Sequence, residues 1–178
     1  AVAGPGGDYG ASSGTLNFAP GETSKTVMLS LTDDALFEGD EGFTLVLENP
    51  VNTSLGAATQ AVTIGDNETQ PTVSLSLAPA SLGENADTAT MTATLSGTTT
   101  QTVTVSLGAS GTATLGSDYN VAGSIVIPAG SLSGTATLSA LQDTLREGDE
   151  TATLAITAVQ GASATGSSFT ATLVDDEA

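Results

Sequence analysis

The sequence predicts an all-β protein made of tandem immunoglobulin-like antiparallel β-sandwiches, arranged end to end. Apolar and polar residues alternate with the period of two that strands require, and no segment has the spacing of an amphipathic helix. The pattern also returns in register after 109 residues, since the acidic string at 33–41 reappears at 142–150. A repeat of this length is a whole domain, and about seven short strands per repeat are typical of a sandwich.

The register of the repeat gives the domain boundaries. Four positions of the first copy match four of the second at the offset of 109: Gly14, Leu29, Glu38 and Asp66 match Gly123, Leu138, Glu147 and Asp175. At this offset, residues from about 72 to 109 have no counterpart in the first copy. We therefore predict that residues 1–69 form the C-terminal part of a domain whose first strands are missing, and that residues 70–178 form a complete domain.

Four strands are expected in the first copy, in the order 16–18, 26–31, 43–47 and 62–64. In the second of them, Val27, Leu29 and Leu31 stand at every second position, so they would share one buried face. The turn signal Ala19-Pro20-Gly21 separates it from the strand before.

The second copy repeats these strands at 125–127, 135–140, 152–156 and 171–173, and adds three before them at 72–77, 88–95 and 102–107. Its core is predicted to be thin, because alanine replaces Val27, Leu31 and Phe43 of the first copy at the matching inward positions. Burial contributes only about 25 cal/mol per Å², so this domain would be marginally stable without further support.

The charge of the chain limits the classes of partner that it can bind. The sequence has twenty acidic residues and only two basic ones, Lys25 and Arg146, which gives a net charge of −18. It contains no His or Cys. So negative a surface repels phosphate backbones and anionic lipid, so we expect no nucleic-acid partner and no direct membrane insertion. Cations are the natural partners. The absence of Cys suits an exported protein that folds without oxidation, and the predicted location is extracellular or at the cell surface.

Catalysis is not expected from this inventory. Without His or Cys there is no conventional pair of nucleophile and base, and the few aromatic residues offer little platform for a sugar substrate. No glycine-rich phosphate loop precedes a predicted helix. We therefore predict that the protein is not an enzyme.

Acidic residues recur at four places in the loops of each copy. These are an Asp-Tyr pair, the aspartates before the Glu-Gly-Asp-Glu motif, the first Glu of that motif, and an acidic run that closes the copy. Loops of a sandwich converge at its two ends, so the four places can meet. Each close pair of carboxylates repels by about 1 kcal/mol in water and about 4 kcal/mol at an effective dielectric constant of 20, so a bound cation is needed.

Among the metal ions, calcium accepts six to eight oxygens in a flexible geometry, whereas magnesium needs a stricter octahedron and zinc or copper would prefer His and Cys. The sequence therefore predicts Ca²⁺.

These motifs resemble the Calx-beta domain, the calcium-binding module of sodium/calcium exchangers that is also repeated in bacterial surface proteins. The resemblance rests on the Asp-Tyr pairs, the string Asp-Asp-x-x-x-Glu-Gly-Asp-Glu-x-Phe at 33–43, and the strand ending Thr-Ile-Gly-Asp-Asn-Glu at 63–68. It implies metal ligands in the first copy at Asp8, Asp33, Asp34, Glu38, Asp66, Asn67 and Glu68. In the second copy it implies Glu84, Asp118, Asp143, Glu147, Asp175, Asp176 and Glu177.

Two positions depart from the family's acidic pattern. Asn67 replaces an acid in the first copy, and Gln142 replaces one in the second, which would weaken or remove one ion. Four further acids of the Glu-Gly-Asp-Glu motifs, Asp40, Glu41, Asp149 and Glu150, are interpreted as turn or strand-start residues rather than ligands. The alternative for the whole set is that these acids only solvate loops and cap turns.

Three functions are compatible with this sequence. The leading hypothesis is a calcium-binding structural repeat of a large extracellular adhesin or surface filament, in which calcium rigidifies loops and domain junctions. Its partners would be neighbouring repeats of the same protein or identical subunits. One alternative is a calcium-sensing regulatory tandem. Another is a fibre subunit that assembles by strand complementation, since missing strands would leave sheet edges exposed.

Overall fold

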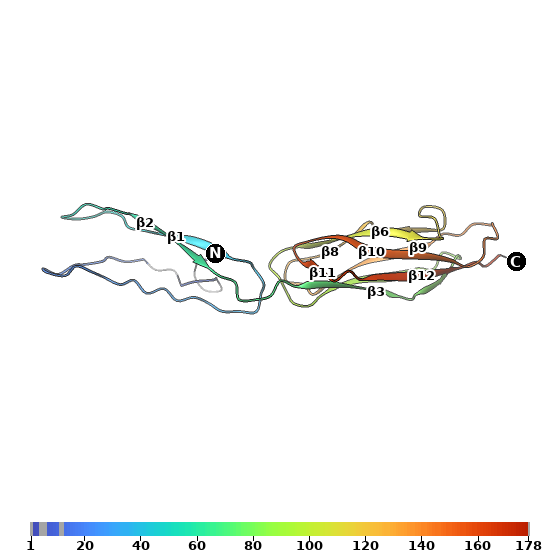
Figure 1. The fold of residues 1–178 in the computed structure, drawn as a ribbon, viewed down its shortest axis with the longest axis horizontal. Helices are drawn as coiled ribbons and strands as arrows, with labels where there is room; N and C mark the ends of the chain where they lie inside the picture. The colour runs from blue at the N-terminus through green and yellow to red at the C-terminus, as the bar shows by residue number, and fades with distance from the viewer. Residues whose placement is uncertain (1, 4–6, 11–12, 178) are drawn as a thin grey trace. The chain divides into compact units, whose positions relative to one another are not determined.

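A computed structural model describes residues 2–3, 7–10 and 13–177 of the protein. The chain divides into two compact units. The first unit consists of residues 1–35 and 39–67, and the second of residues 36–38 and 68–178. The described residues form strands and no helix, so the all-β prediction is confirmed (Figure 1). A helix able to cross a membrane is accordingly not found among them.

The second unit is a sandwich of two five-stranded sheets. One sheet has the order β4 (Ser81–Gly83), β12 (Ser168–Val174), β10 (Glu150–Gln160), β6 (Val103–Gly111) and β8 (Ser124–Ile127). The other has the order β11 (Ser163–Ala164), β3 (Thr72–Ala78), β5 (Thr88–Leu95), β9 (Ser133–Ala140) and β7 (Tyr119–Val121). The predicted sandwich is thus confirmed, with strands close to the predicted ranges.

Two of the pairings between named strands of the second unit are parallel, although the sequence predicted antiparallel sheets. β4 runs parallel to β12, and the short β11 runs parallel to β3. After β3 the chain crosses to the opposite sheet and continues as β4, so it comes to lie beside the last strand in the same direction. The parallel pair β4–β12 matters for function, because both of its strands end at the same pole of the sandwich.

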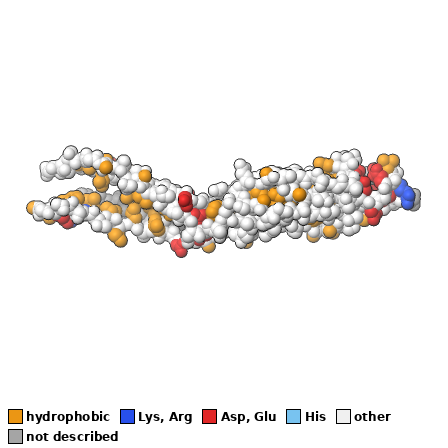
Figure 2. Space-filling model, in the orientation of Figure 1, with side chains coloured by type: hydrophobic (Ala, Val, Ile, Leu, Met, Phe, Trp, Pro, Cys, Tyr) orange, Lys and Arg blue, Asp and Glu red, His pale blue; other side chains and the backbone are white. Residues whose placement is uncertain are grey.

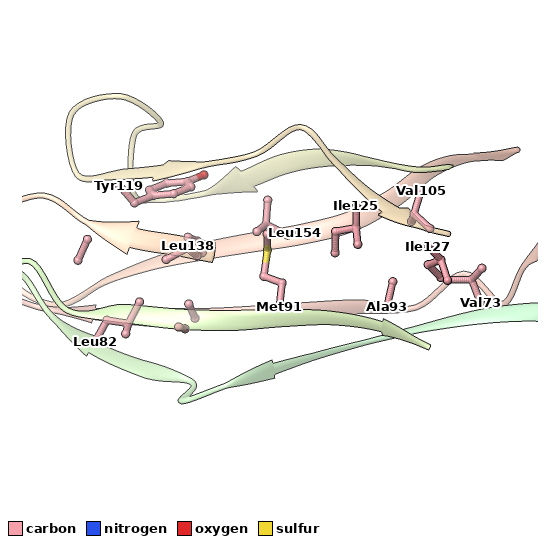
Figure 3. Close-up of a cluster of buried hydrophobic side chains, with 14 of the residues drawn as sticks. Val73, Leu82, Met91, Ala93, Val105, Tyr119, Ile125, Ile127, Leu138 and Leu154 are labelled. Carbon is pink, nitrogen blue, oxygen red and sulfur yellow. The ribbon is translucent and has the colours of Figure 1, made fainter. Parts of the chain in front are cut away.

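The core of the second unit lies between its two sheets. In Figure 3 Met91 reaches from β5 toward Leu154 on β10, and both are at most 1% exposed. The predicted thinness is also present, because alanines occupy several fully buried positions, namely 89, 93, 140, 152 and 171. Each of them buries far less apolar area than leucine would, so we expect the sandwich to be only marginally stable without a bound ion.

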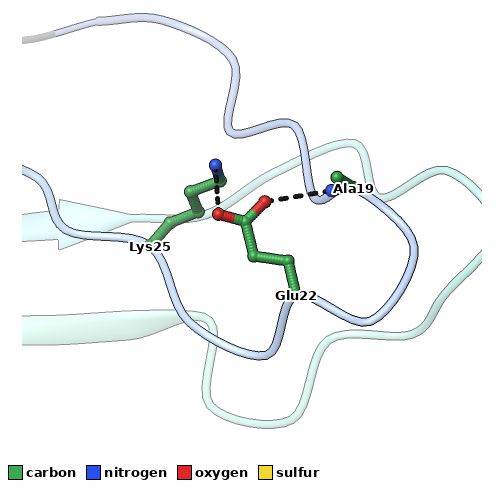
Figure 4. A network of polar contacts seen from close by, with 3 residues as sticks. All are labelled: Ala19, Glu22 and Lys25. Atoms are coloured by element: carbon green, nitrogen blue, oxygen red, sulfur yellow. Dashed lines mark hydrogen bonds and ion pairs between the residues drawn. The ribbon is translucent and has the colours of Figure 1, made fainter.

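The first unit contains one described sheet, an antiparallel pair of β1 (Glu41–Val46) and β2 (Thr59–Ile64). Phe43 lies opposite Val62 in this pair, and the ring of Tyr9 stacks on Phe43 with centroids 4.0 Å apart. The predicted turn at Ala19-Pro20-Gly21 is present: the Glu22 amide donates to the Ala19 carbonyl at 2.9 Å. The Glu22 carboxylate accepts from the Ala19 amide and pairs with Lys25 (Figure 4).

The strands predicted at 16–18 and 26–31 do not form, so that part of the sequence prediction is wrong. Their apolar side chains are exposed, Phe18 by 54% and Leu31 by 62%, whereas the matching Ile127 and Ala140 of the second unit are buried. In the second unit β8 pairs with β6 and β9 pairs with β5. At the offset of 109 this sequence holds no counterpart of β5 and almost none of β6. Alternating apolar and polar residues show that a segment is suited to be a strand. The strand forms only where a neighbouring segment takes up its backbone hydrogen bonds.

Candidate metal centre

The parallel pair β4–β12 brings the first group of carboxylates together. Gly83 lies beside Val174 in its register, so the next residues, Glu84 and Asp175, leave the two strands side by side. The Glu84 amide donates to the Val174 carbonyl at 3.2 Å, which continues the pairing for one more step. Carboxylate oxygens of Glu84, Asp175 and Glu177 all lie within 4.8 Å of one another.

A second group forms from loops at the same pole. Asp118 directly precedes β7, Glu150 is the first residue of β10, and Glu147 lies in the loop before it. Their carboxylate oxygens lie within 4.8 Å of one another. The Asp118 carbonyl accepts from the Leu141 amide at 2.8 Å, which fixes the Asp118 turn to the loop that follows β9.

The two groups act on each other electrostatically. Burial raises the pKa of Glu84, and the charges of Asp175, Asp143, Glu147 and Asp118 raise it further. Burial also raises the pKa of Glu147, with Asp118, Asp143 and Asp175 adding to the shift. We call these interacting residues the acidic pole: Glu84, Asp118, Asp143, Glu147, Glu150, Asp175 and Glu177. Figure 2 shows acidic side chains gathered at the end of the second unit.

Unpaired oxygens within the acidic pole fit a cation. Glu84 is only 2% exposed and Asp118 only 7%. Buried oxygens of Glu84 (Oε1), Glu150 (Oε2) and Glu177 (Oε2) have no hydrogen-bond partner. A buried carboxylate oxygen without a partner costs free energy unless an opposite charge compensates it. A cation held between the two groups would satisfy these oxygens.

Asp175 is held in place by backbone donors rather than by burial. Its Oδ2 accepts from the Gly148 amide at 2.8 Å and its Oδ1 from the Glu177 amide at 3.1 Å, and these bonds lower its pKa. Gly148 has a φ of +81°, a conformation that a residue with a Cβ adopts only with strain. In the first unit Gly39, at +78°, donates likewise to Asp66 at 2.6 Å. The glycine of each Glu-Gly-Asp-Glu motif therefore positions the aspartate of the closing run.

Sequence reasoning missed Glu150 and Glu41 as members of the clusters. Glu150 does begin a strand, as predicted, but it shares the inward face of β10 with the buried Ala152 and Leu154, so its carboxylate points into the pole. Glu41 stands in the same way before Phe43 on β1. The period-two alternation of each strand, extended back by one step, is the signal that would have found both residues.

Two predicted ligands of the second unit, Asp143 and Asp176, lie outside the two groups of three carboxylates, although Asp143 belongs to the acidic pole. Asp143 is half-buried and accepts from the Leu145 amide at 2.7 Å. Asp176 is exposed and accepts from the side-chain amide of Gln142. Asp176 therefore stands at the rim, outside the two groups of three carboxylates.

In the first unit the structure brings some of the predicted residues together. The predicted ligand Asp8 has a carboxylate oxygen within 4.8 Å of one from Glu41, which was not predicted as a ligand. The Asp8 carbonyl accepts from the Thr32 amide at 2.9 Å. Asp33 accepts from the side-chain amide of Asn67 at 3.1 Å. Asp40 accepts from the Asp66 amide at 3.1 Å, as expected of a turn residue.

The remaining predicted ligands of the first copy differ in exposure. Asp34 lies in the first unit and is exposed. Glu38 and Glu68 belong to the second unit by their contacts, and both are half-buried. The sequence-predicted set of the first copy thus includes residues of both units.

The metal-free acidic pole predicts an unusual dependence of stability on pH. Burial and hydrogen bonding to Asp175 and Asp176 raise the pKa of Glu177 from 4.5 to about 7. Between these values the folded protein holds a proton that the unfolded chain has released, so folding stability falls as pH rises through this window. We expect metal-stripped protein to melt at a higher temperature at about pH 5.5 than at about pH 8. Glu177→Gln should flatten this profile, and an unchanged slope in that variant would contradict the assignment.

Comparison with known proteins gives the family. The model of the Calx-beta domain matches residues 1–68 and again residues 66–177. Sodium/calcium exchanger 1 of Bos taurus is 41% identical over 61 residues, which are 34% of this chain and 6% of that protein. The extracellular matrix organizing protein FRAS1 of Mus musculus is 40% identical over 67 residues, which are 37% of this chain and 2% of that protein. The chain therefore covers only a small part of the length of these relatives.

A crystal structure of CBD12 from CALX1.2 shares the fold, with a TM-score of 0.51 and 19% sequence identity over 60% of this chain and 45% of that chain. The family match extends over both copies of the repeat and nearly all of the sequence. This chain belongs to the Calx-beta domain family.

Proposed function

We propose that the acidic pole of the second unit binds calcium and that the pole is the functional centre of this protein. The observation that carries the proposal is Glu84, which is 2% exposed and has an unpaired Oε1 beside the other carboxylates of the pole. A charged group of this kind is tolerated only next to a compensating charge. Calcium suits a site made of several carboxylates from different loops, because it takes six to eight oxygens at about 2.3–2.6 Å in variable geometry.

In the proposed role, calcium rigidifies the loops of a structural repeat in an extracellular adhesin or surface filament. The role is non-catalytic. Ions that bind only the folded form stabilise it by about 2.7 kcal/mol each at a hundredfold excess over Kd. This contribution is large compared with the stability that we expect from a core of small residues. The similarity to a protein named for organising the extracellular matrix supports a location outside the cell.

Calorimetric titration of the metal-stripped chain with calcium tests this function directly. We expect saturable binding, followed by a clear rise in the melting temperature of the second unit relative to protein in chelator. Magnesium at the same concentration serves as the control, because its stricter octahedral geometry suits these loops less well. If no heat of binding is observed at millimolar calcium, the proposed function is wrong, and the acidic residues serve only as a solvated surface.

Similarity to sodium/calcium exchanger 1 favours a second candidate, a calcium-sensing regulatory tandem. A sensor changes shape reversibly over a narrow range of calcium concentration, whereas a structural repeat keeps its shape once loaded. Small-angle scattering across a calcium titration separates the two. A reversible change in the radius of gyration near micromolar calcium would favour the sensor.

Exposed apolar side chains of the first unit favour a third candidate, assembly by strand complementation. Leu16 and Phe18 are 38% and 54% exposed, whereas the matching Ile125 and Ile127 are buried against β6. A segment with the alternating pattern of β5 and β6 would cover them and complete the sandwich. A synthetic peptide of residues 88–111 should then bind the chain and add strand signal in circular dichroism. A peptide with the same composition in scrambled order is the control, and equal binding of both would count against this candidate.

A further inference from the structure

One polar pair occurs in both copies with its two partners exchanged. In the first unit the Asn67 side-chain amide donates to Asp33 Oδ1 at 3.1 Å. In the second unit the Gln142 side-chain amide donates to Asp176 Oδ1 at 3.3 Å. At the offset of 109, position 33 matches 142 and position 67 matches 176. The acid and the amide have therefore changed places, and the hydrogen bond between the two positions has been kept.

The exchanged pair links the same two segments in each unit. One partner stands five residues before the first Glu of the Glu-Gly-Asp-Glu motif, and the other lies in the closing acidic run. All four side chains are exposed, so packing of the core does not require them. What the two copies share is the charge of the pair, which is one carboxylate and one neutral donor. Two carboxylates at these positions would repel each other, and two amides would leave no anion for a cation.

Gln142 also reaches the acidic pole itself. Its amide nitrogen donates to Glu177 Oε1 at 3.0 Å and to the Asp143 carbonyl at 2.9 Å. Glu177 belongs to the first carboxylate group, with the buried Glu84 and Asp175. The side-chain amide of Gln142 thus donates hydrogen bonds to oxygens that a cation at the rim of the pole would otherwise bind.

We propose that this amide–carboxylate pair takes the place of one bound cation, so that each unit holds one ion fewer than it would with acids at both positions. The inference rests on the proposed calcium binding of the acidic pole. Gln142 in the second unit, and Asn67 in the first, then determine how many ions are bound. Oε1 of Glu84 has no hydrogen-bond partner, so this pair does not occupy it, and the inner ion would be retained.

Calcium titration of the full chain and its variants tests the proposal, with calcium chloride as the only ligand. Gln142→Glu adds a carboxylate and removes the donor, so we expect about one additional ion per chain and a metal-free melting temperature a few degrees lower. Asn67→Asp should add one ion independently. Gln142→Leu removes the hydrogen bonds without adding charge, so it should lower the metal-free melting temperature without changing the ion number.

A double variant gives the matched control. Gln142→Asp combined with Asp176→Asn recreates in the second unit the arrangement of the first, so the ion number should stay that of the natural chain. An unchanged ion number in both Gln142→Glu and Asn67→Asp would overturn the inference. If the natural chain still binds calcium in that case, the proposed function stands. If the natural chain binds no calcium, the inference fails together with the proposed function.

Discussion

Glu84→Gln should lower the calcium affinity of the second unit by on the order of a hundredfold. The substitution keeps the size of the side chain but removes the most buried negative charge of the acidic pole. Loss of one partner from a buried charged contact costs about 3 kcal/mol or more, which corresponds to this factor. The same change should raise the melting temperature of metal-free protein, because it relieves the repulsion that Asp175 and Asp143 exert on the buried carboxylate.

The opposite signs of the two effects make this prediction specific. A merely structural glutamate would lose stability on substitution both with and without calcium. Glu48→Gln is the matched control, because it makes the same chemical change at an exposed position that follows β1. Titration calorimetry and thermal melts, each with calcium and with chelator, measure both effects. A metal-free protein that is destabilised by Glu84→Gln would contradict the repulsion argument.

Leu154→Ala should destabilise the second unit by about 2–5 kcal/mol, the range for buried leucines that leave a cavity. Leu154 is 1% exposed and faces Met91 across the two sheets. Because alanines already fill many of the neighbouring core positions, few larger side chains can move to close the cavity. A loss of this size is a large fraction of the usual stability of a domain, so the metal-free variant should unfold at a clearly lower denaturant concentration.

Leu132→Ala provides the comparison for the core prediction. It removes the same atoms from a side chain that is 51% exposed, so its cost should remain well below that of Leu154→Ala. Chemical denaturation followed by circular dichroism gives both free energies of unfolding. We also expect calcium to restore part of the stability of Leu154→Ala, since ions bind only the folded form. Equal losses for the two variants would show that the core does not carry the stability of this sandwich.

The sequence predicts the second unit better than the first, for a physical reason. Alternation over 88–95 or 152–156 marks a strand, and the second unit also supplies the neighbours that such strands pair with. The same alternation at 26–31 fails because the matching neighbours are not in this sequence. A residue pattern therefore gives the face that a strand would bury, but the backbone hydrogen bonds of the strand depend on another segment.

The candidate site shows a similar division. Convergence of scattered acids at one pole follows from the repeat and from sandwich topology, and the acidic pole contains six of the residues predicted for the second copy. Glu150 was missed because its motif suggests a turn, whereas its strand directs the side chain inward. The contact between Gln142 and Asp176 could not be predicted, because no sequence rule gives the direction in which an exposed amide points.

The parallel pair β4–β12 also bears on how the second unit responds to mechanical tension. Three residue pairs join these strands, which are the second and the last strand of the sandwich in chain order. Tension that pulls β4 backward and β12 forward along the chain loads their hydrogen bonds in shear, so the bonds must break together rather than one after another. Glu84 and Asp175 continue this pair by one step at the acidic pole. An ion bound between them would add a contact that resists the same sliding motion, so the force needed to unfold the domain should depend on calcium.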